Sequence, residues 1–201
     1  EQGGFTFVVG HEPKNLDEIV GYEASKTVKS KINKNKISIF LNGISEEFKP
    51  GIKNYATIDA SPAYKTNKHQ DVLFINLNSS KGGIRPTNAD QWINLKHDLE
   101  TREEGNIILF LPTPVFGSNG FVDKLEAELF HDTLVSAKER DKNIFVVHGG
   151  TTTKTELKDG IRYIGLDTRE LKSPEDIKNL SLVEFVVNGK DISYEINKIF
   201  N

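Results

Sequence analysis

Apolar residues along the chain follow two periods, and their alternation predicts strands interleaved with helices. Short apolar runs of strand length alternate with longer segments in which an apolar residue recurs at every third or fourth position. The predicted strands are 5–9, 37–41, 72–77, 106–111, 144–147 and 161–166, with a further strand near 55–58. The predicted helices are 16–32, a helix after Asn88 that contains Trp92, and 122–140 on Leu125, Leu129 and Leu134.

Polar residues mark where several of these elements begin. Asn15 and Glu18 have the spacing of a capping box at the start of the first helix. Ser173 precedes a proline and two acidic residues, which is typical of the first turn of a short helix. Trp92 shares a helical face with Leu95 and Leu99. We therefore expect Trp92 to be buried against a sheet, with an exposed platform for sugars as the alternative.

The C-terminal segment has the pattern of a β-hairpin. Asn188-Gly189 lies between two β-rich runs, 183–187 and 192–196, which we expect to pair. A hairpin after alternating strands and helices favours mixed sheets over a purely parallel one. The sequence therefore predicts an α/β protein built from mixed sheets.

Composition narrows the class of protein. The chain has 201 residues, the length of one ordinary domain, and a net charge of −3 with both signs mixed, so no nucleic-acid partner is expected. It has no cysteine, which excludes disulfides and thiolate metal sites, and no methionine, which indicates a mature or excised piece of a larger protein. No apolar run reaches the ~18 residues of a membrane span, so no membrane insertion is expected. The lack of cysteine fits a secreted or cell-surface protein at least as well as a cytosolic one.

Histidines are the natural candidates for chemistry, because imidazole both ligates metals and transfers protons. His11 and His148 each follow a predicted buried strand, and sites form at such strand ends in open α/β sheets. His97 and His131 are expected on helix surfaces, and His69 in a loop. The threonine run Thr151–Thr153 follows two glycines, where it either offers hydroxyls to an anion or forms a turn.

The motifs of the second half give the chain a family resemblance. The helix 91-QWINLKHDL-99 matches the pattern Gln-Trp-x-x-Leu-x-x-Asp-Leu, and 159-DGIRY-163 matches an Asp-Gly-(Val/Ile)-Arg-Tyr hairpin. In this order they resemble calcineurin-like metallophosphoesterases, and most closely modules of large multidomain bacterial surface phosphoesterases. The resemblance extends over about 72–200 and covers 5–62 only by position. It implies a four-layer αββα sandwich, with residues 1–201 as one domain, and a pair of metal ions in active members.

The metal-binding positions of that family carry other residue types here. The Gly-His-x-His motif falls on Gly149, Gly150 and Thr152, and the His-x-Pro motif on Pro112 and Pro114. The remaining ligand positions fall on His11 and Pro13, on Asn42 and Gly43, on Asp59 and on Asn78. The resemblance therefore implies a frame that has lost its metal pair, and no cofactor is expected. The candidates for a remnant cleft are His11, Asn42, Asp59, His148, Thr151 and Thr152.

Three functions remain open on this reasoning. The first is a non-catalytic module of a larger extracellular or wall-associated bacterial protein, which packs on neighbouring domains or binds a surface polymer. The second is an active metal-dependent phosphoesterase with rearranged ligands, such as His11, Asp59 and His148. The third is a module that binds a cell-wall glycan or phosphopolymer in the remnant cleft, where neutral donors suit polyols better than divalent metals.

Overall fold

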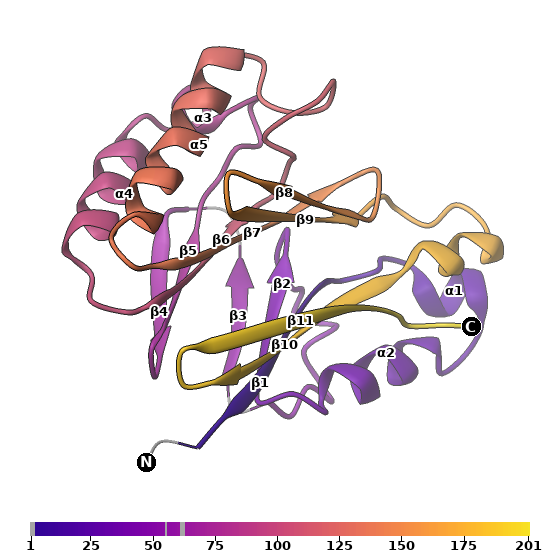
Figure 1. Cartoon of the computed structure of the whole chain (residues 1–201). Helices are drawn as coiled ribbons and strands as arrows, with labels where there is room; N and C mark the ends of the chain where they lie inside the picture. The colour runs from indigo at the N-terminus through magenta and orange to yellow at the C-terminus, as the bar shows by residue number, and fades with distance from the viewer. Residues whose placement is uncertain (1–2, 55, 61–62) are drawn as a thin grey trace. The chain divides into compact units, whose positions relative to one another are not determined.

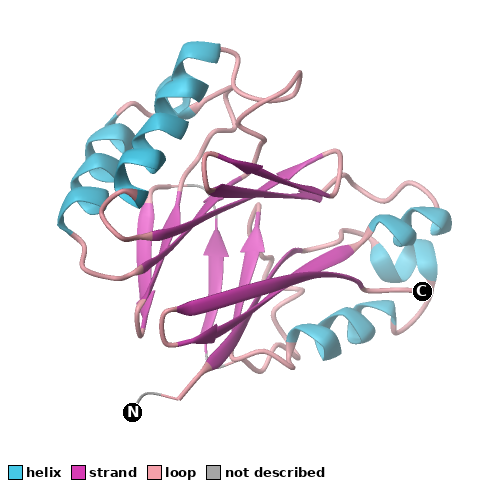
Figure 2. Ribbon diagram, in the orientation of Figure 1, coloured by secondary structure: helices cyan, strands magenta, loops and turns pink. Residues whose placement is uncertain are grey.

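A computed structural model describes residues 3–54, 56–60 and 63–201, and these divide into two compact units (Figure 1). Unit 1 comprises Glu1–Ala60, Thr151–Thr153 and Leu166–Asn201, and unit 2 comprises Ser61–Gly150 and Lys154–Gly165. Each unit contains one β-sheet together with helices (Figure 2). No helix in the described ranges is both long enough and apolar enough to cross a membrane.

The sheet of unit 1 has five strands in the order β11-β10-β1-β2-β3. They are β1 (Phe5–His11), β2 (Ile37–Leu41), β3 (Ala56–Ala60), β10 (Ser181–Asn188) and β11 (Asp191–Lys198). β1, β2 and β3 run parallel, whereas β10 pairs antiparallel with both β1 and β11. The helices α1 (Leu16–Val20) and α2 (Ala24–Ile32) and the 3₁₀ helix η1 (Pro174–Asn179) belong to the same unit. Val8, Phe40 and Leu182 of the sheet share one apolar cluster with helix residues such as Val28 and Ile32.

The first predicted helix is two helices, and the predicted capping box is wrong. Gly21 at φ 134° and Glu23 at φ 79° interrupt the helical backbone between α1 and α2. Asn15 has a left-handed φ of 58°, and its side chain makes no capping hydrogen bond. An N-cap requires extended backbone, so the Asn15 geometry does not allow one. Instead, Asp17 accepts hydrogen bonds from the backbone N–H of Ser25 at 2.9 Å and from its hydroxyl at 2.8 Å, at the start of α2.

The sheet of unit 2 has six strands in the order β4-β5-β6-β7-β9-β8. They are β4 (Lys65–His69), β5 (Val72–Asn76), β6 (Asn106–Leu111), β7 (Asn143–Gly150), β8 (Lys154–Lys158) and β9 (Ile161–Asp167). β5, β6 and β7 are parallel, and the pairs β4–β5 and β8–β9 are antiparallel. The helices are α3 (Ile84–Thr87), α4 (Asp90–Thr101) and α5 (Lys124–Lys138). Their apolar side chains form one cluster with Ile75, Leu109 and Val146 of the sheet.

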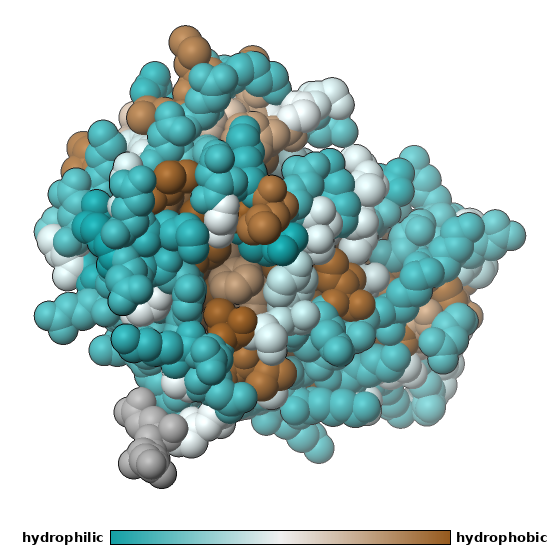
Figure 3. Space-filling model, viewed as in Figure 1, coloured by the Kyte–Doolittle hydropathy of each residue, from teal (hydrophilic) through white to brown (hydrophobic). Residues whose placement is uncertain are grey.

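Helix α5 is present as predicted, but its buried face is not the predicted one. Leu125 is 74% exposed and Leu129 is 39% exposed, while Ala127, Phe130 and Leu134 are buried. At about 100° per residue, Leu134 lies on the opposite side of the helix from Leu125, so only Leu134 of the three predicted leucines shares the buried face with Phe130. Hydrophilic side chains predominate on the surface seen in Figure 3, and hydrophobic ones are scattered among them.

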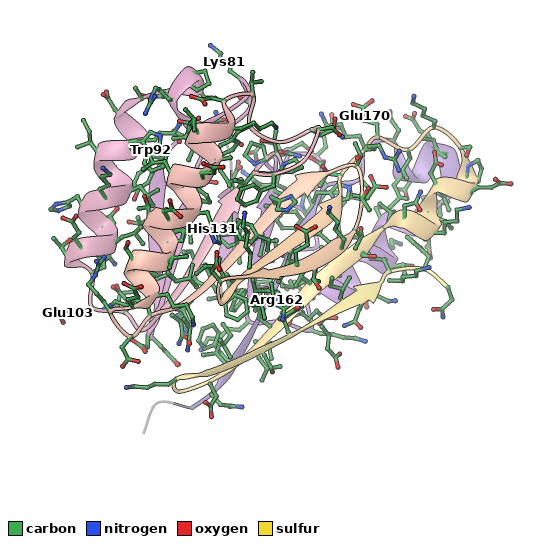
Figure 4. All side chains as sticks on the ribbon, turned by 45° about the horizontal axis from the view of Figure 1, so that its top comes forward. Lys81, Trp92, Glu103, His131, Arg162 and Glu170 are labelled. Atoms are coloured by element: carbon green, nitrogen blue, oxygen red, sulfur yellow. The ribbon has the colours of Figure 1, made fainter. Side chains whose placement is uncertain are left out.

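Two side chains of α4 and α5 are anchored by polar partners (Figure 4). Trp92 is buried, as predicted, and its indole N–H donates to Glu126 Oε2 at 2.8 Å. His131, predicted on the surface, is 3% exposed. Its Nδ1 lies 2.7 Å from the hydroxyl of Tyr163 and its Nε2 lies 2.7 Å from Asp159 Oδ2. The prediction failed because both ring nitrogens find partners on or beside β9, and a satisfied imidazole is easily buried.

The predicted pairing of the runs 183–187 and 192–196 in a C-terminal hairpin is confirmed, although Asn188, predicted in the turn, is the last residue of β10. Val183 to Val187 pair with Ile196 to Ile192, and Asn188 opposite Asp191 closes the ladder. The loop is therefore Gly189-Lys190, with Gly189 at φ 61°. Both sheets combine parallel and antiparallel pairs, which confirms the mixed-sheet α/β class. The stacking of layers as αββα and the single domain over 1–201 stay predictions.

Candidate functional site

A small polar cavity lies at the carboxyl ends of β1 and β2 in unit 1. Its volume is about 170 Å³, and its lining includes His11, Asn42, Gly43, Arg169 and Glu170. The first three residues end or follow β1 and β2, which are parallel, so they meet at one edge of the sheet. Arg169 and Glu170 come from the loop between β9 and η1, where Glu170 is marked in Figure 4. Asn42 at φ 63° and Gly43 at φ 93° form a left-handed turn that brings the backbone beside this cavity.

His11 is the most unusual group at this edge. It is 8% exposed, and its Nδ1 is buried with no hydrogen-bond partner among the described residues. Burial lowers the pKa of His11 to about 4, although the negative charge of Asp167 acts in the opposite direction. The imidazole is therefore uncharged at neutral pH.

Asp167 is the carboxylate near His11, and Arg169 binds it through both oxygens. The guanidinium donates from Nε to Oδ1 at 3.0 Å and from Nη2 to Oδ2 at 2.8 Å, and the backbone N–H of Arg169 donates to Oδ1 at 3.1 Å. The backbone N–H of Asp167 donates to Thr153 Oγ1 at 3.0 Å. Asp167 is 8% exposed. The bidentate pairing neutralises this carboxylate and occupies the oxygens that a metal ion would need.

The six candidates from the sequence are only partly brought together. His11 and Asn42 line the same cavity. Asp59 lies within β3, opposite Phe40 in the register. It is not among the residues that line this cavity. Thr151 and Thr152 are exposed, and their neighbour Thr153 is the threonine that bonds to Asp167.

His148, the sixth candidate, belongs to unit 2. It is 7% exposed, and its Nδ1 lies 2.8 Å from the carbonyl oxygen of Gly149. Burial lowers its pKa, and the hydrogen bond to Gly149 opposes that shift. The sequence analysis missed Asp167 and Arg169, and it left Thr153 out of the candidates for the remnant cleft. The one signal that could have found them is the position of Asp167 directly after the apolar run 161–166.

The loops of unit 2 that would carry metal ligands in the resembled family are held by framework contacts. Gln91 accepts from the backbone N–H of Asn78 at 2.8 Å and donates to its carbonyl oxygen at 2.9 Å, which fixes the loop after β5. A Cβ added to Gly150 would lie 3.1 Å from Cγ of Pro114. Gly150 is not among the glycines with positive φ, so a side chain there would not strain the backbone. Crowding against Pro114 is what limits substitution at this position.

The donor set of unit 1 does not fit a metal pair. Within the described ranges, no three His, Cys, Asp or Glu side chains are grouped as a metal-ligand set. The side chains of ligand type that line the cavity are His11, Glu12 and Glu170. Glu12 accepts hydrogen bonds from Ser45, and the nearby Asp167 is held by Arg169. A cation placed beside a guanidinium would also meet charge repulsion.

Comparisons with known proteins give distant structural likenesses. No family model and no curated protein matches the sequence. Among solved structures, a single mutant of Vps29 from Entamoeba histolytica is similar over 98% of this chain and 99% of its own, with 9% identity and a TM-score of 0.41. Wild-type Vps29 complexed with Zn²⁺, from the same organism, is similar over 97% of this chain and 99% of its own, with 9% identity and a TM-score of 0.40. Vps29 has the calcineurin-like metallophosphoesterase fold.

Proposed function

We propose that this chain is a non-catalytic, metallophosphoesterase-like module that acts by binding. It would serve a larger extracellular or wall-associated bacterial protein, with neighbouring domains and a cell-wall glycan or phosphopolymer as its partners. The resemblance of motifs between Val72 and Phe200 supports the family part of this proposal. The extracellular part rests on the resemblance to surface phosphoesterases, and the cysteine-free composition fits it at least as well as a cytosolic location.

The pairing of Arg169 with Asp167 beside His11 carries the proposal. A phosphoesterase site of this kind needs a charged metal pair to activate water. Here the carboxylate near the strand end is neutralised by a guanidinium at 2.8 Å, and the adjoining imidazole is buried and uncharged. The same cavity offers hydrogen-bond donors and acceptors, and its two acidic side chains, Glu12 and Glu170, are balanced by the basic Lys14 and Arg169, which suits recognition of a polar ligand.

Metal content and turnover test the non-catalytic part directly. We expect purified protein to contain no stoichiometric Mn, Zn or Fe and to leave bis-p-nitrophenyl phosphate intact with any added divalent metal. Circular dichroism of the same sample would establish that the protein is folded. The proposal is wrong if metal-loaded protein hydrolyses the diester and if His11→Ala and Asp167→Ala, both still folded, abolish that activity.

Arg169 provides a second test on the same site. Arg169→Ala releases the carboxylate of Asp167, so the variant should bind Zn²⁺ more tightly than the wild-type chain in a titration with a competing chelator. Arg162→Ala, which removes an arginine of unit 2, serves as the matched control and should leave zinc binding unchanged. Equal affinity of the wild-type chain and Arg169→Ala would argue that the guanidinium does not exclude metal.

A further inference from the structure

Three cavities of unit 1 adjoin one another along the loops that follow β1, β2 and β9. The middle one, of about 170 Å³, is the cavity beside His11. A second, of about 160 Å³, is lined in part by η1 and shares Arg169 and Glu170 with the middle cavity. A third, of about 400 Å³, is lined in part by α1 and α2 and shares Glu12, Pro13 and Lys14 with it. Each outer cavity shares wall residues with the middle one, so the three are direct neighbours, and together we call them the unit 1 groove.

The walls of the unit 1 groove are held in place by their own hydrogen bonds. Glu12 accepts from the backbone N–H of Ser45 at 3.0 Å and also from the Ser45 hydroxyl. Asp176 accepts from the backbone N–H of Lys172 at 2.8 Å and from that of Ser173 at 3.0 Å. Such contacts fix the loops before a ligand arrives, which reduces the entropy lost on binding.

The charge of the groove selects against polyanions. Seven of its lining side chains are acidic and four, Lys14, Lys29, Arg169 and Lys172, are basic, a net charge of −3. A phosphate chain would meet this acidic excess in the two outer cavities, because the lining of the middle cavity has equal numbers of acidic and basic side chains. A neutral hydroxyl-bearing chain would not, because each hydroxyl can donate to a carboxylate and accept from a lysine or arginine. The uncharged His11 at the middle cavity adds no positive charge that would favour an anion at neutral pH.

We infer that the unit 1 groove binds a neutral polysaccharide, with successive sugar rings lying in successive cavities. This inference rests on the proposed binding function and chooses the glycan over the phosphopolymer. Each of the two smaller cavities is below the ~300–1,000 Å³ of a site for a drug-sized ligand, so one sugar alone gains little there. Affinity should therefore grow with the number of linked rings until the groove is filled.

Calorimetric titration with oligosaccharides of defined length tests this inference. The probes are one-, three- and six-residue oligomers of β-1,4-linked N-acetylglucosamine, of β-1,4-linked glucose and of mannose, with poly(glycerol phosphate) as the anionic polymer. We expect at least one neutral series to gain about tenfold or more in affinity from monomer to hexamer, and poly(glycerol phosphate) to bind more weakly than that hexamer. The inference is overturned if none of the three series gains affinity with length. It is also overturned if poly(glycerol phosphate) binds more tightly than the best neutral hexamer.

Substitutions at the junctions of the groove locate the binding. Glu170→Trp fills the junction between the first two cavities, and Lys14→Trp fills the junction with the third. Each should remove most of the length dependence, whereas Lys81→Trp, at an exposed position of unit 2 (Figure 4), should leave it intact. If one junction variant fails to fold, the other still tests the groove, and unchanged length dependence in a folded junction variant contradicts it.

The outcomes separate this inference from the proposed function. Phosphodiester turnover that depends on His11 would refute the proposed function, whether or not the protein binds oligosaccharides. Absence of length-dependent sugar binding in a protein that neither holds metal nor turns over the diester would refute only the polysaccharide.

Discussion

His11 combines burial with an unpartnered ring nitrogen, and this makes the stability of unit 1 depend on pH. The unfolded chain binds a proton at His11 near pH 6.5, whereas the folded chain does so only near pH 4. Protonation therefore favours the unfolded state, and stability is lost as pH falls from 6.5 towards 4. The full loss from this group is about 3 kcal/mol, from the 1.36 kcal/mol that accompanies each pKa unit.

Urea unfolding at pH 7, 5.5 and 4.5 measures this loss. We expect His11→Leu to flatten the fall in unfolding free energy between pH 6.5 and 4, because the apolar side chain cannot be protonated. His148 has a lowered pKa from burial and contributes in the same direction, so part of the slope should remain. His97→Leu, at an exposed position on α4, is the matched control and should keep the wild-type slope. An unchanged slope in His11→Leu would contradict the assignment.

The sequence could predict some of the candidate site but not its ion pair. His11 was identified because it follows a predicted strand, and Asn42 because a ligand motif of the resembled family falls on it. The parallel pairing of β1 and β2 brings both residues to one edge of the sheet. Asp167 and Arg169 belong to no recognisable motif. Only the structure shows that the end of β9 places them near His11, where they form an ion pair. Thr152 was chosen because a ligand motif of the resembled family falls on it. A single sequence does not say which hydroxyl of the run Thr151–Thr153 makes a structural hydrogen bond, and in the structure that of Thr153 does.

Among the helices, α5 is tied to α3 and α4 by one buried carboxylate. Glu126 is 2% exposed, and its Oε2 accepts from the indole N–H of Trp92 at 2.8 Å and from the backbone N–H of Arg85 at 2.8 Å. Replacing it with an apolar residue leaves both donors without an acceptor. We expect Glu126→Leu to lower the free energy of unfolding by about 2–6 kcal/mol, at ~1–3 kcal/mol for each of the two unsatisfied donors. Glu128→Leu, exposed on the same helix, should change it by less than ~0.5 kcal/mol, and equal effects of the two would rule out the link.

The orientation of α5 gives a second comparison at this scale. Phe130 is fully buried and contacts both Trp92 and Phe121, whereas Leu125 is 74% exposed. We expect Phe130→Ala to cost about 3–5 kcal/mol, as for other large-to-small changes in cores. Leu125→Ala should cost less than ~0.5 kcal/mol. Chemical denaturation followed by Trp92 fluorescence measures both costs. A larger cost for Leu125→Ala than for Phe130→Ala would mean that Leu125, as predicted from the sequence, lies on the buried face.

Elements with strong apolar patterns were predictable, and polar ones were not. β2 and β6 were predicted with the bounds that the structure has, because all their residues are buried. Neither β4 (Lys65–His69) nor β8 was among the predicted strands. Both lie at the edges of the unit 2 sheet and carry mostly exposed polar side chains. Edge strands need no apolar alternation, since one side of their backbone has no strand neighbour.

At the scale of the whole molecule, unit 1 is built from both ends of the chain. β1 and β2 come from the first 41 residues, whereas β10 and β11 come from residues 181–198. β10 pairs with β1 along five residue pairs, and Phe185 of β10 stacks on Phe7 of β1 with ring centroids 4.5 Å apart. The sheet of unit 1 is therefore incomplete until the last strands have been made.

Deletion of residues 181–201 tests how far unit 1 depends on this closure. Without β10 and β11, β1 becomes an edge strand and loses its antiparallel partner, the stack on Phe185, and the apolar contribution of Leu182 to the cluster around Val8. We expect amide hydrogen exchange in 5–11 and 37–41 to accelerate by about 100-fold or more, because protection follows the local free energy of opening. Removal of Asn201 alone, an exposed residue outside every strand, should leave exchange in both segments at the wild-type rate. Full protection of β1 in the truncated chain would mean that the three parallel strands and α1–α2 are stable without the C-terminal hairpin, and that the pairing of β1 with β10 contributes little to the fold.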